Sequence, residues 1–284
     1  MIKLAGDKVI ITVAQTGAYP TKSMNPNLPE QPEEIAESAY ACHQEGASIC
    51  HIHARDKEGK ITGSQDVFQE IHDRIHSKCD IIVQDSTGGG PNLTLEQRFE
   101  CLNAKPEMAS LNMGTMIRVS GQHAGLPFLN IRKDIETYIA KMNELGIRPE
   151  MEVYNHAMFR EVNNLIQKDL VKKPYYINLV LGAMHQGAVD ATSEYLYSMI
   201  DFLPEDSIFN VTAIGIAQLP LTTMGMILGG CIRVGMEDNI YYRRGELVKN
   251  NAQLVARAVR IARELNKEPA TPAEARKILG LKST

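Results

Sequence analysis

The pair His51 and His53, separated by one residue, is the pattern in this chain that points most directly to chemistry. It ends a run of small and apolar residues, 47–52, which follows Gly46 and is typical of a buried strand. Because side chains alternate along a strand, the two imidazoles share one face, about 6.6 Å apart. Two imidazoles on one face can bind a divalent metal such as zinc. The alternative is one core and one surface histidine, and a third ligand has to come from elsewhere in the chain.

A second group of ionisable residues follows the predicted strand 231–234. Arg233, Glu237 and Asp238 bring one cation and two carboxylates close together in the sequence. Glu237 could complete a His₂Glu site, a common pattern of catalytic zinc with open positions for substrate. Asp238 could then act as a base, with Arg233 holding either this carboxylate or an anionic substrate. The alternative is a solvated, charged turn before a helix.

A glycine-rich loop follows the predicted strand 81–83. Ser86 and Thr87 offer hydroxyl donors there. Gly88, Gly89 and the glycine after them let backbone N–H groups approach an anion closely. The loop suits a carboxylate or a phosphate, but it is not a Walker motif, because no Gly-Lys-Ser/Thr sequence follows. The alternative is a flexible turn without a ligand.

Two further predicted strands end in polar residues. Ser110 and Asn112 share one face at the end of strand 108–113, and both can donate to a bound oxygen. Glu152, in strand 151–154, could support a metal ligand or act as an acid or base. The alternative for Ser110 and Asn112 is a pair of interior polar residues that bond to one another.

Strand and helix patterns alternate along the whole chain, which predicts a (β/α)₈ barrel. We expect residues 1–284 to form a single barrel domain with a short C-terminal helical tail. A doubly wound open sheet is the alternative, but no glycine-rich dinucleotide fingerprint follows the first strand. In a barrel, the polar residues at the C-terminal ends of the strands face the active site. The predicted strands are 9–13, 48–53, 81–83, 108–113, 151–154, 176–181, 209–214 and 231–234, and the last long helix is predicted over about 246–265.

The composition narrows the classes of partner. The chain has 284 residues, 44% of them hydrophobic, and a formal net charge of −4. This balance gives no electrostatic reason to expect nucleic acid or a membrane surface. No apolar run approaches the roughly 18 residues of a membrane span. The five cysteines are scattered and form no Cys-X-X-Cys pair, which favours a reducing, cytoplasmic compartment.

Taken together, these stretches resemble the β-keto acid cleavage enzyme family, and the likeness covers nearly the whole chain. The resemblance implies a zinc-dependent (β/α)₈ barrel that condenses a β-keto acid with acetyl-CoA and releases acetoacetate and a new acyl-CoA. It also implies homo-oligomers, with a tetramer favoured. The matching stretches are 16–18, 27–29, 51–55, 86–89, 105–112, 149–154, 232–239 and, near the end, 251–255.

The resemblance also suggests roles for individual residues. It places zinc on His51, His53 and Glu237, and it makes Arg233 and Asp238 the catalytic pair. Among the substrate-binding residues, Ser86 matches a serine of the family, and Ser110 stands where a threonine is usual.

One position departs from the family pattern. Members that act on 3-keto-5-aminohexanoate carry Glu directly after Thr-Gly-Ala, placed to pair with the substrate ammonium. This chain has Tyr19 there, in a long proline-rich loop of the kind that often covers a barrel mouth. Because tyrosine supplies no negative charge, we expect neutral or anionic β-keto acids to be preferred over the amino substrate.

Two other classes of protein remain as alternatives. A zinc hydrolase of the amidohydrolase type is also a barrel with His-X-His, but it needs further histidine ligands. His123, His156 and His185 are not placed convincingly at the ends of the fifth and sixth predicted strands. The other alternative is a barrel that binds a ligand without catalysis.

Overall fold

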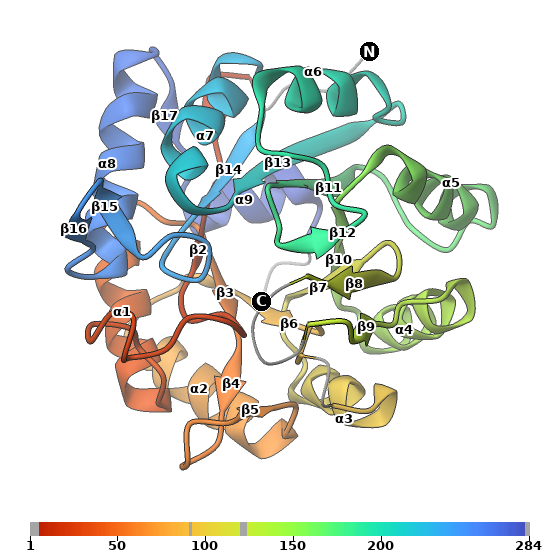
Figure 1. Ribbon diagram of the computed structural model, residues 1–284, viewed down its shortest axis with the longest axis horizontal. Helices are drawn as coiled ribbons and strands as arrows, with labels where there is room; N and C mark the ends of the chain where they lie inside the picture. The colour runs from red at the N-terminus through yellow and green to blue at the C-terminus, as the bar shows by residue number, and fades with distance from the viewer. Residues whose placement is uncertain (1–5, 91–92, 120–123, 282–284) are drawn as a thin grey trace.

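Eight parallel strands form a closed barrel in the computed structural model, which describes residues 6–90, 93–119 and 124–281 (Figure 1). Strands that follow one another along the chain are neighbours around the barrel, and the last pairs with the first. The (β/α)₈ prediction is therefore confirmed. The barrel strands are β2 (Ile11–Ala14), β3 (Ile49–Ile52), β6 (Ile82–Ser86), β7 (Met108–Asn112), β10 (Arg148–Val153), β11 (Tyr175–Leu181), β13 (Ser207–Ala213) and β14 (Cys231–Val234).

Helices surround the barrel (Figure 1), and local sequence signals explain several of their ends. Thr94 caps α3 (Leu95–Phe99) by accepting a hydrogen bond from the backbone of Gln97. Gly46 ends α1 (Pro32–Glu45) and Gly146 ends α4 (Arg132–Leu145), both in the left-handed conformation. No helix in the described part of the chain is long and apolar enough to cross a membrane. The outer helices are α1 (Pro32–Glu45), α2 (Gln65–His76), α3 (Leu95–Phe99) with the 3₁₀ turn η1 (Glu100–Ala104), α4 (Arg132–Leu145), α5 (Phe159–Gln167), α6 (Ser193–Asp201), α7 (Gln218–Ile227) and α8 (Asn251–Glu264).

The predicted C-terminal tail forms the helix α9 (Pro272–Leu279) and closes one end of the barrel. A small apolar cluster fills the interior at the N-terminal ends of the strands, where Ile10, Ile49 and Tyr176 gather with Leu279. Arg276 of α9 also forms ion pairs with Glu107 and Asp80, just before β7 and β6. The open end of the barrel is therefore at the C-terminal ends of its strands.

Most predicted boundaries differ from the observed ones by a few residues, and two of these differences have a clear local cause. The third strand continues through the polar residues 84–86, because Gln84 and Asp85 find buried partners in His51 and His72. The last long helix begins at Asn251 rather than near 246, because Asn250 caps it by accepting from the backbone of Gln253. The preceding residues form the strand β16 (Glu246–Leu247), paired with β15 (Tyr241–Arg243).

A small antiparallel sheet, absent from the sequence prediction, lies beside the open end of the barrel (Figure 1). It joins the loop after β7 to the loop after β11 through β8 (Met116–Arg118), β9 (Pro127–Phe128) and β12 (His185–Gln186). We call it the mouth sheet. On the other side of the opening, the loop after β2 is fastened by Arg55, whose guanidinium donates to the carbonyls of Gly17 and Pro20.

Candidate active site

A cavity of about 370 Å³ lies at the C-terminal ends of the barrel strands. Its floor carries the ionisable residues singled out in the sequence, and its walls come from the loop after β2 and from the mouth sheet. Among the sequence-predicted residues, those that line the cavity are Tyr19, His51, His53, Ser86, Gly88, Asn112, Glu152, Arg233, Glu237 and Asp238.

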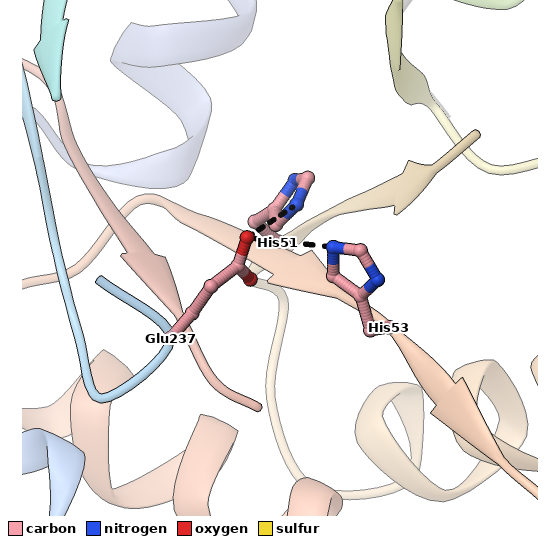
Figure 2. A group of neighbouring side chains, drawn as sticks. All are labelled: His51, His53 and Glu237. Atoms are coloured by element: carbon pink, nitrogen blue, oxygen red, sulfur yellow. Dashed lines mark ion pairs between the residues drawn. The ribbon is translucent and has the colours of Figure 1, made fainter. Parts of the chain in front are cut away.

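His51, His53 and Glu237 lie together on this floor (Figure 2). The Nε2 atoms of His51 and His53 lie 3.7 and 3.4 Å from the same Glu237 oxygen. One potential ligand atom from each residue falls within 4.8 Å of the others. The two histidines come from the end of β3 and the residue after it, and the glutamate follows β14. The strand alternation expected from the sequence therefore does turn both imidazoles toward one point.

The donor set fits a divalent metal. His51 donates from Nδ1 to the side-chain oxygen of Gln84 at 2.8 Å, which leaves its Nε2 lone pair facing Glu237. Burial, helped by the charge of Arg233, lowers the pKa of His51 to about 3, so this imidazole is neutral and able to bind a metal. One oxygen of Glu237 is buried without a hydrogen-bond partner among the described residues. The other oxygen of Glu237 faces the two imidazoles and also accepts from Arg233. A carboxylate with one buried, unsatisfied oxygen beside two histidines is well explained by a bound cation.

Two glycines place Glu237. Gly235 has φ +139°, and a Cβ there would lie 2.1 Å from the carbonyl oxygen of Ala14. Gly17 has φ +69°, and its Cβ would lie 2.5 Å from Cγ of Glu237. The chain after β14 can therefore cross the end of β2 closely only because these positions lack side chains. Sequence reasoning missed both, since the contact joins segments more than 200 residues apart.

We expect Gly17→Ala to weaken metal binding by displacing Glu237. The positive φ also costs alanine about 1–2 kcal/mol of stability. Gly245→Ala is a matched control, because Gly245 has φ +78° and a Cβ there would face open space, with nothing within 4 Å. Zinc titration should give a dissociation constant at least about tenfold higher for Gly17→Ala, equivalent to 1.4 kcal/mol, and unchanged for Gly245→Ala. Equal zinc affinity in the two variants would contradict this placement of Glu237.

Arg233 holds three carboxylates around the floor. It donates to both oxygens of Asp238 at 2.8 and 2.9 Å, and it pairs with Glu152 at 3.4 Å and with Glu237. Burial opposes ionisation of Glu237, but Arg233 and the two histidines hold its pKa well below the usual range. For Asp238 burial outweighs the opposing effect of Arg233, and its pKa rises to about 6. The site thus keeps one carboxylate strongly ionised beside a second, more basic one.

Some of the remaining substrate-binding candidates line the cavity, and others lie behind it. Ser86 and Gly88 face the cavity, and the hydroxyl of Ser86 accepts from the backbone N–H of Gly88 at 3.1 Å. Thr87, Gly89 and Ser110 are not among the residues that line it. The Thr87 hydroxyl donates instead to the Ser110 carbonyl at 2.7 Å, so both residues help to hold the loop from behind.

Several cavity residues were not identified from the sequence as parts of the site. Tyr154 donates to Glu152 at 3.1 Å, and its position two residues after Glu152, directly after β10, was an available signal. Arg118, Phe128 and Met184 line the wall. They depend on the mouth sheet, whose very short strands carry no periodic pattern in the sequence.

A family model described as beta-keto acid cleavage enzyme matches residues 8–281 of the chain. The chain belongs to this family. One relative, a 3-keto-5-aminohexanoate cleavage enzyme from Acetoanaerobium sticklandii, is 39% identical over 97% of this chain and 99% of its own length. Another, a 3,5-dioxohexanoate:acetyl-CoA acetone transferase from Paraburkholderia graminis, is 34% identical over 97% of this chain and 96% of its own length. The resemblance drawn from the sequence is confirmed, and the protein is an enzyme of the β-keto acid cleavage class.

Solved structures agree on the fold. ObcA, in a ternary complex with a C4-CoA adduct and oxalate, superposes with a TM-score of 0.75 at 19% identity. The match covers 90% of this chain and 68% of the ObcA chain. At this level of identity the likeness supports the barrel architecture alone.

The amidohydrolase-type alternative gains no support from the site. Within the described ranges, His51, His53 and Glu237 make up the one group of three or more potential ligands. His156 contacts the hydroxyl of Ser198 at 2.8 Å, and His185 lies on the cavity wall rather than in the ligand group. His123 lies outside the described residues. The late ligand candidate is thus a glutamate, as the family resemblance implies.

Proposed function

We propose that this enzyme uses zinc to condense a β-keto acid with acetyl-CoA, giving acetoacetate and a new acyl-CoA. The observation that carries the proposal is the His51, His53 and Glu237 group directly beside the Arg233–Asp238 pair on one cavity floor. The family match and the acetyl-CoA transferase named among the relatives support the same reaction class.

The metal's contribution is electrophilic. Zinc bound by His51, His53 and Glu237 would act as a Lewis acid toward the oxygens of the keto acid and acidify the adjacent C–H bond. The zinc preference follows from the donor set of two imidazoles and one carboxylate.

In this proposal, Asp238 moves the proton. Its carboxylate takes a proton from the carbon between the keto group and the carboxylate, and the resulting carbanion attacks the acetyl thioester and expels CoA thiolate. The thiolate then adds to the original keto carbon. Cleavage of the adjacent C–C bond leaves the new acyl-CoA and an acetoacetate carbanion, which recovers the proton from Asp238.

The other floor residues orient these groups. Arg233 fixes the Asp238 carboxylate through two hydrogen bonds, and Glu152 accepts from the remaining guanidinium nitrogen of Arg233. Ser86, which lines the cavity beside Gly88, supplies a hydroxyl donor for the substrate carboxylate. Asn112 adds an amide donor to the same cavity. Thr87 and Ser110 support this loop through the hydrogen bond between them.

A single assay tests the reaction class. The purified enzyme is incubated with acetyl-CoA and a panel of β-keto acids, and acetoacetate is measured. Turnover that requires acetyl-CoA supports the proposal. Turnover that requires only water would favour the hydrolase instead, and binding without turnover would favour a non-catalytic barrel.

The proposal also covers the oligomeric state of the enzyme and its location in the cell. We propose a homo-oligomer, with a tetramer favoured by the family resemblance. A cytoplasmic location fits the five cysteines, which are all free of disulfides in the described residues.

Tyr19 supports a substrate without an ammonium group. It lines the cavity, and no nearby acid of the described residues replaces the missing charge: Asp85 faces His72 at 2.8 Å, and Asp238 is held by Arg233. An ammonium group in this partly desolvated mouth would have no anionic partner of its own, which costs several kcal/mol.

We expect Tyr19→Glu to favour the amino substrate. The new carboxylate would supply the missing negative charge and also offset Arg118, whose guanidinium carbon lies 5.6 Å from the Tyr19 ring. The kcat/KM ratio of 5-amino-3-oxohexanoate to 3-oxohexanoate should rise by about tenfold or more. Tyr19→Gln is the uncharged control and should leave the ratio near that of the parent enzyme. A parent enzyme that prefers the amino substrate would contradict the inference.

A further inference from the structure

The mouth sheet turns one cation into the cavity. On its central strand β8, Met116 and Arg118 line the cavity, whereas Ile117 between them is 39% exposed on the other side. Strand alternation explains this arrangement. Backbone pairing with His185 on β12 fixes the position of Arg118, so the guanidinium belongs to a built wall and not to a free loop.

Arg118 differs from the other arginines near the mouth. Arg55 pairs with Glu30, and Arg233 pairs with three carboxylates. Arg118 makes no ion pair with any carboxylate of the described residues, and the residues outside the described ranges include no Asp or Glu. Its contact within the site is the ring of Tyr19, at 5.6 Å.

The charges on the floor do not compensate this cation. Glu152 and Asp238 pair with Arg233, and Glu237 lies between Arg233 and the two histidines. The floor carboxylates are therefore directed at other groups, and Arg118 is left without one. His185 adds no second cation beside it, because burial and the neighbouring Arg118 lower the pKa of this imidazole.

We propose that Arg118 binds a terminal carboxylate on the acyl chain of the keto acid, so that β-keto dicarboxylates are the preferred substrates. The inference rests on the proposed function, in which the other carboxylate lies at the floor. The wall beside Arg118 is apolar, with Met116, Phe128 and Met184, and it suits the methylene groups between the two ends. A guanidinium in such surroundings recognises a carboxylate by paired hydrogen bonds.

The phosphates of CoA are the competing anion. They lie at the far end of the pantetheine arm from the thioester that reacts at the floor. Arg118 lies in the wall of the cavity that encloses the reacting groups, so a substituent of the keto acid is the nearer partner.

The test compares 3-oxoadipate with 3-oxohexanoate, which has the same chain length and a methyl group in place of the terminal carboxylate. With saturating acetyl-CoA, we expect kcat/KM to be at least about tenfold higher for the diacid. Arg118→Met should remove this preference and leave the value for 3-oxohexanoate within about threefold of the parent enzyme, since its apolar stem is retained. Arg118→Lys should keep an intermediate preference. Arg243→Met removes an exposed arginine paired with Glu246 and serves as the matched control.

Three results would overturn the proposal. One is a parent enzyme that does not prefer the diacid. A second is an Arg118→Met variant that loses activity equally on both keto acids. The third is an unchanged ratio with a raised KM for acetyl-CoA, which would assign Arg118 to the CoA phosphates.

Calorimetric titration without acetyl-CoA separates this proposal from the proposed function. Weaker binding of 3-oxoadipate by Arg118→Met, by at least about tenfold, supports the carboxylate site even if the enzyme turns over neither compound. Equal dissociation constants for the parent enzyme and Arg118→Met would contradict it. If Arg118→Met does not fold, judged by circular dichroism, Arg118→Lys replaces it in the same titration.

Discussion

His51→Ala, His53→Ala and Glu237→Ala should each lose bound zinc and bring turnover down to background, while the barrel stays folded. All three side chains meet at one point on the cavity floor, and a His₂Glu site has no ligand to spare. Residues at this end of a barrel serve function more than stability, because the apolar layers that hold the strands lie elsewhere. Metal analysis of the purified variants, with circular dichroism as a folding check, measures both effects.

His185→Ala is the matched control for this prediction. It removes an imidazole that lines the same cavity but lies outside the ligand group, so it should retain zinc. Chelation of the parent enzyme should also abolish turnover, and added zinc should restore it. Full zinc occupancy in Glu237→Ala would remove that residue from the site.

The barrel could be predicted because its signals are local. Residues 47–52 indicate a buried strand by composition, and Gly46 marks the end of the helix before it. Because such signals recur along the chain, the number of strands can be predicted without knowing which strands pair. The same alternation put His51 and His53 on one face, which the structure bears out.

The third strand shows where local reasoning fails. Its last three residues are polar, so composition ended the strand at 83. In the fold, Gln84 is bonded to His51 and Asp85 to His72, and this pairing is what allows polar side chains to be buried. These partners lie on other elements, and no local pattern near residue 84 predicts them.

The cavity wall was beyond prediction for a similar reason. Arg118 and His185 lie 67 positions apart and meet only because two loops pair their backbones. Gly17 is important because it lies close to Glu237 in the fold, and this closeness cannot be inferred from their positions in the sequence. Sequence patterns thus predicted the residues of the cavity floor, which lie at the ends of barrel strands. They did not predict the residues of the cavity wall, which lie on loops and on the mouth sheet.

Asp238→Asn should lower kcat by at least about 10² while zinc and keto acid still bind. The amide keeps one oxygen to accept from Arg233, so the loop should hold its shape, but it cannot take up the substrate proton. Exchange of the substrate's acidic C–H with deuterated water, measured by NMR without acetyl-CoA, isolates this step from acyl transfer.

Glu152→Gln separates the two buried acids that face the cavity beside Arg233. Glu152 accepts from Arg233 and from Tyr154, so its substitution should loosen Arg233 and lower kcat without stopping the exchange. Asp238→Asn should instead bring exchange down to the rate seen without enzyme. If exchange continues at the parent rate in Asp238→Asn and stops in Glu152→Gln, then Glu152 is the base, and Asp238 serves only to hold Arg233.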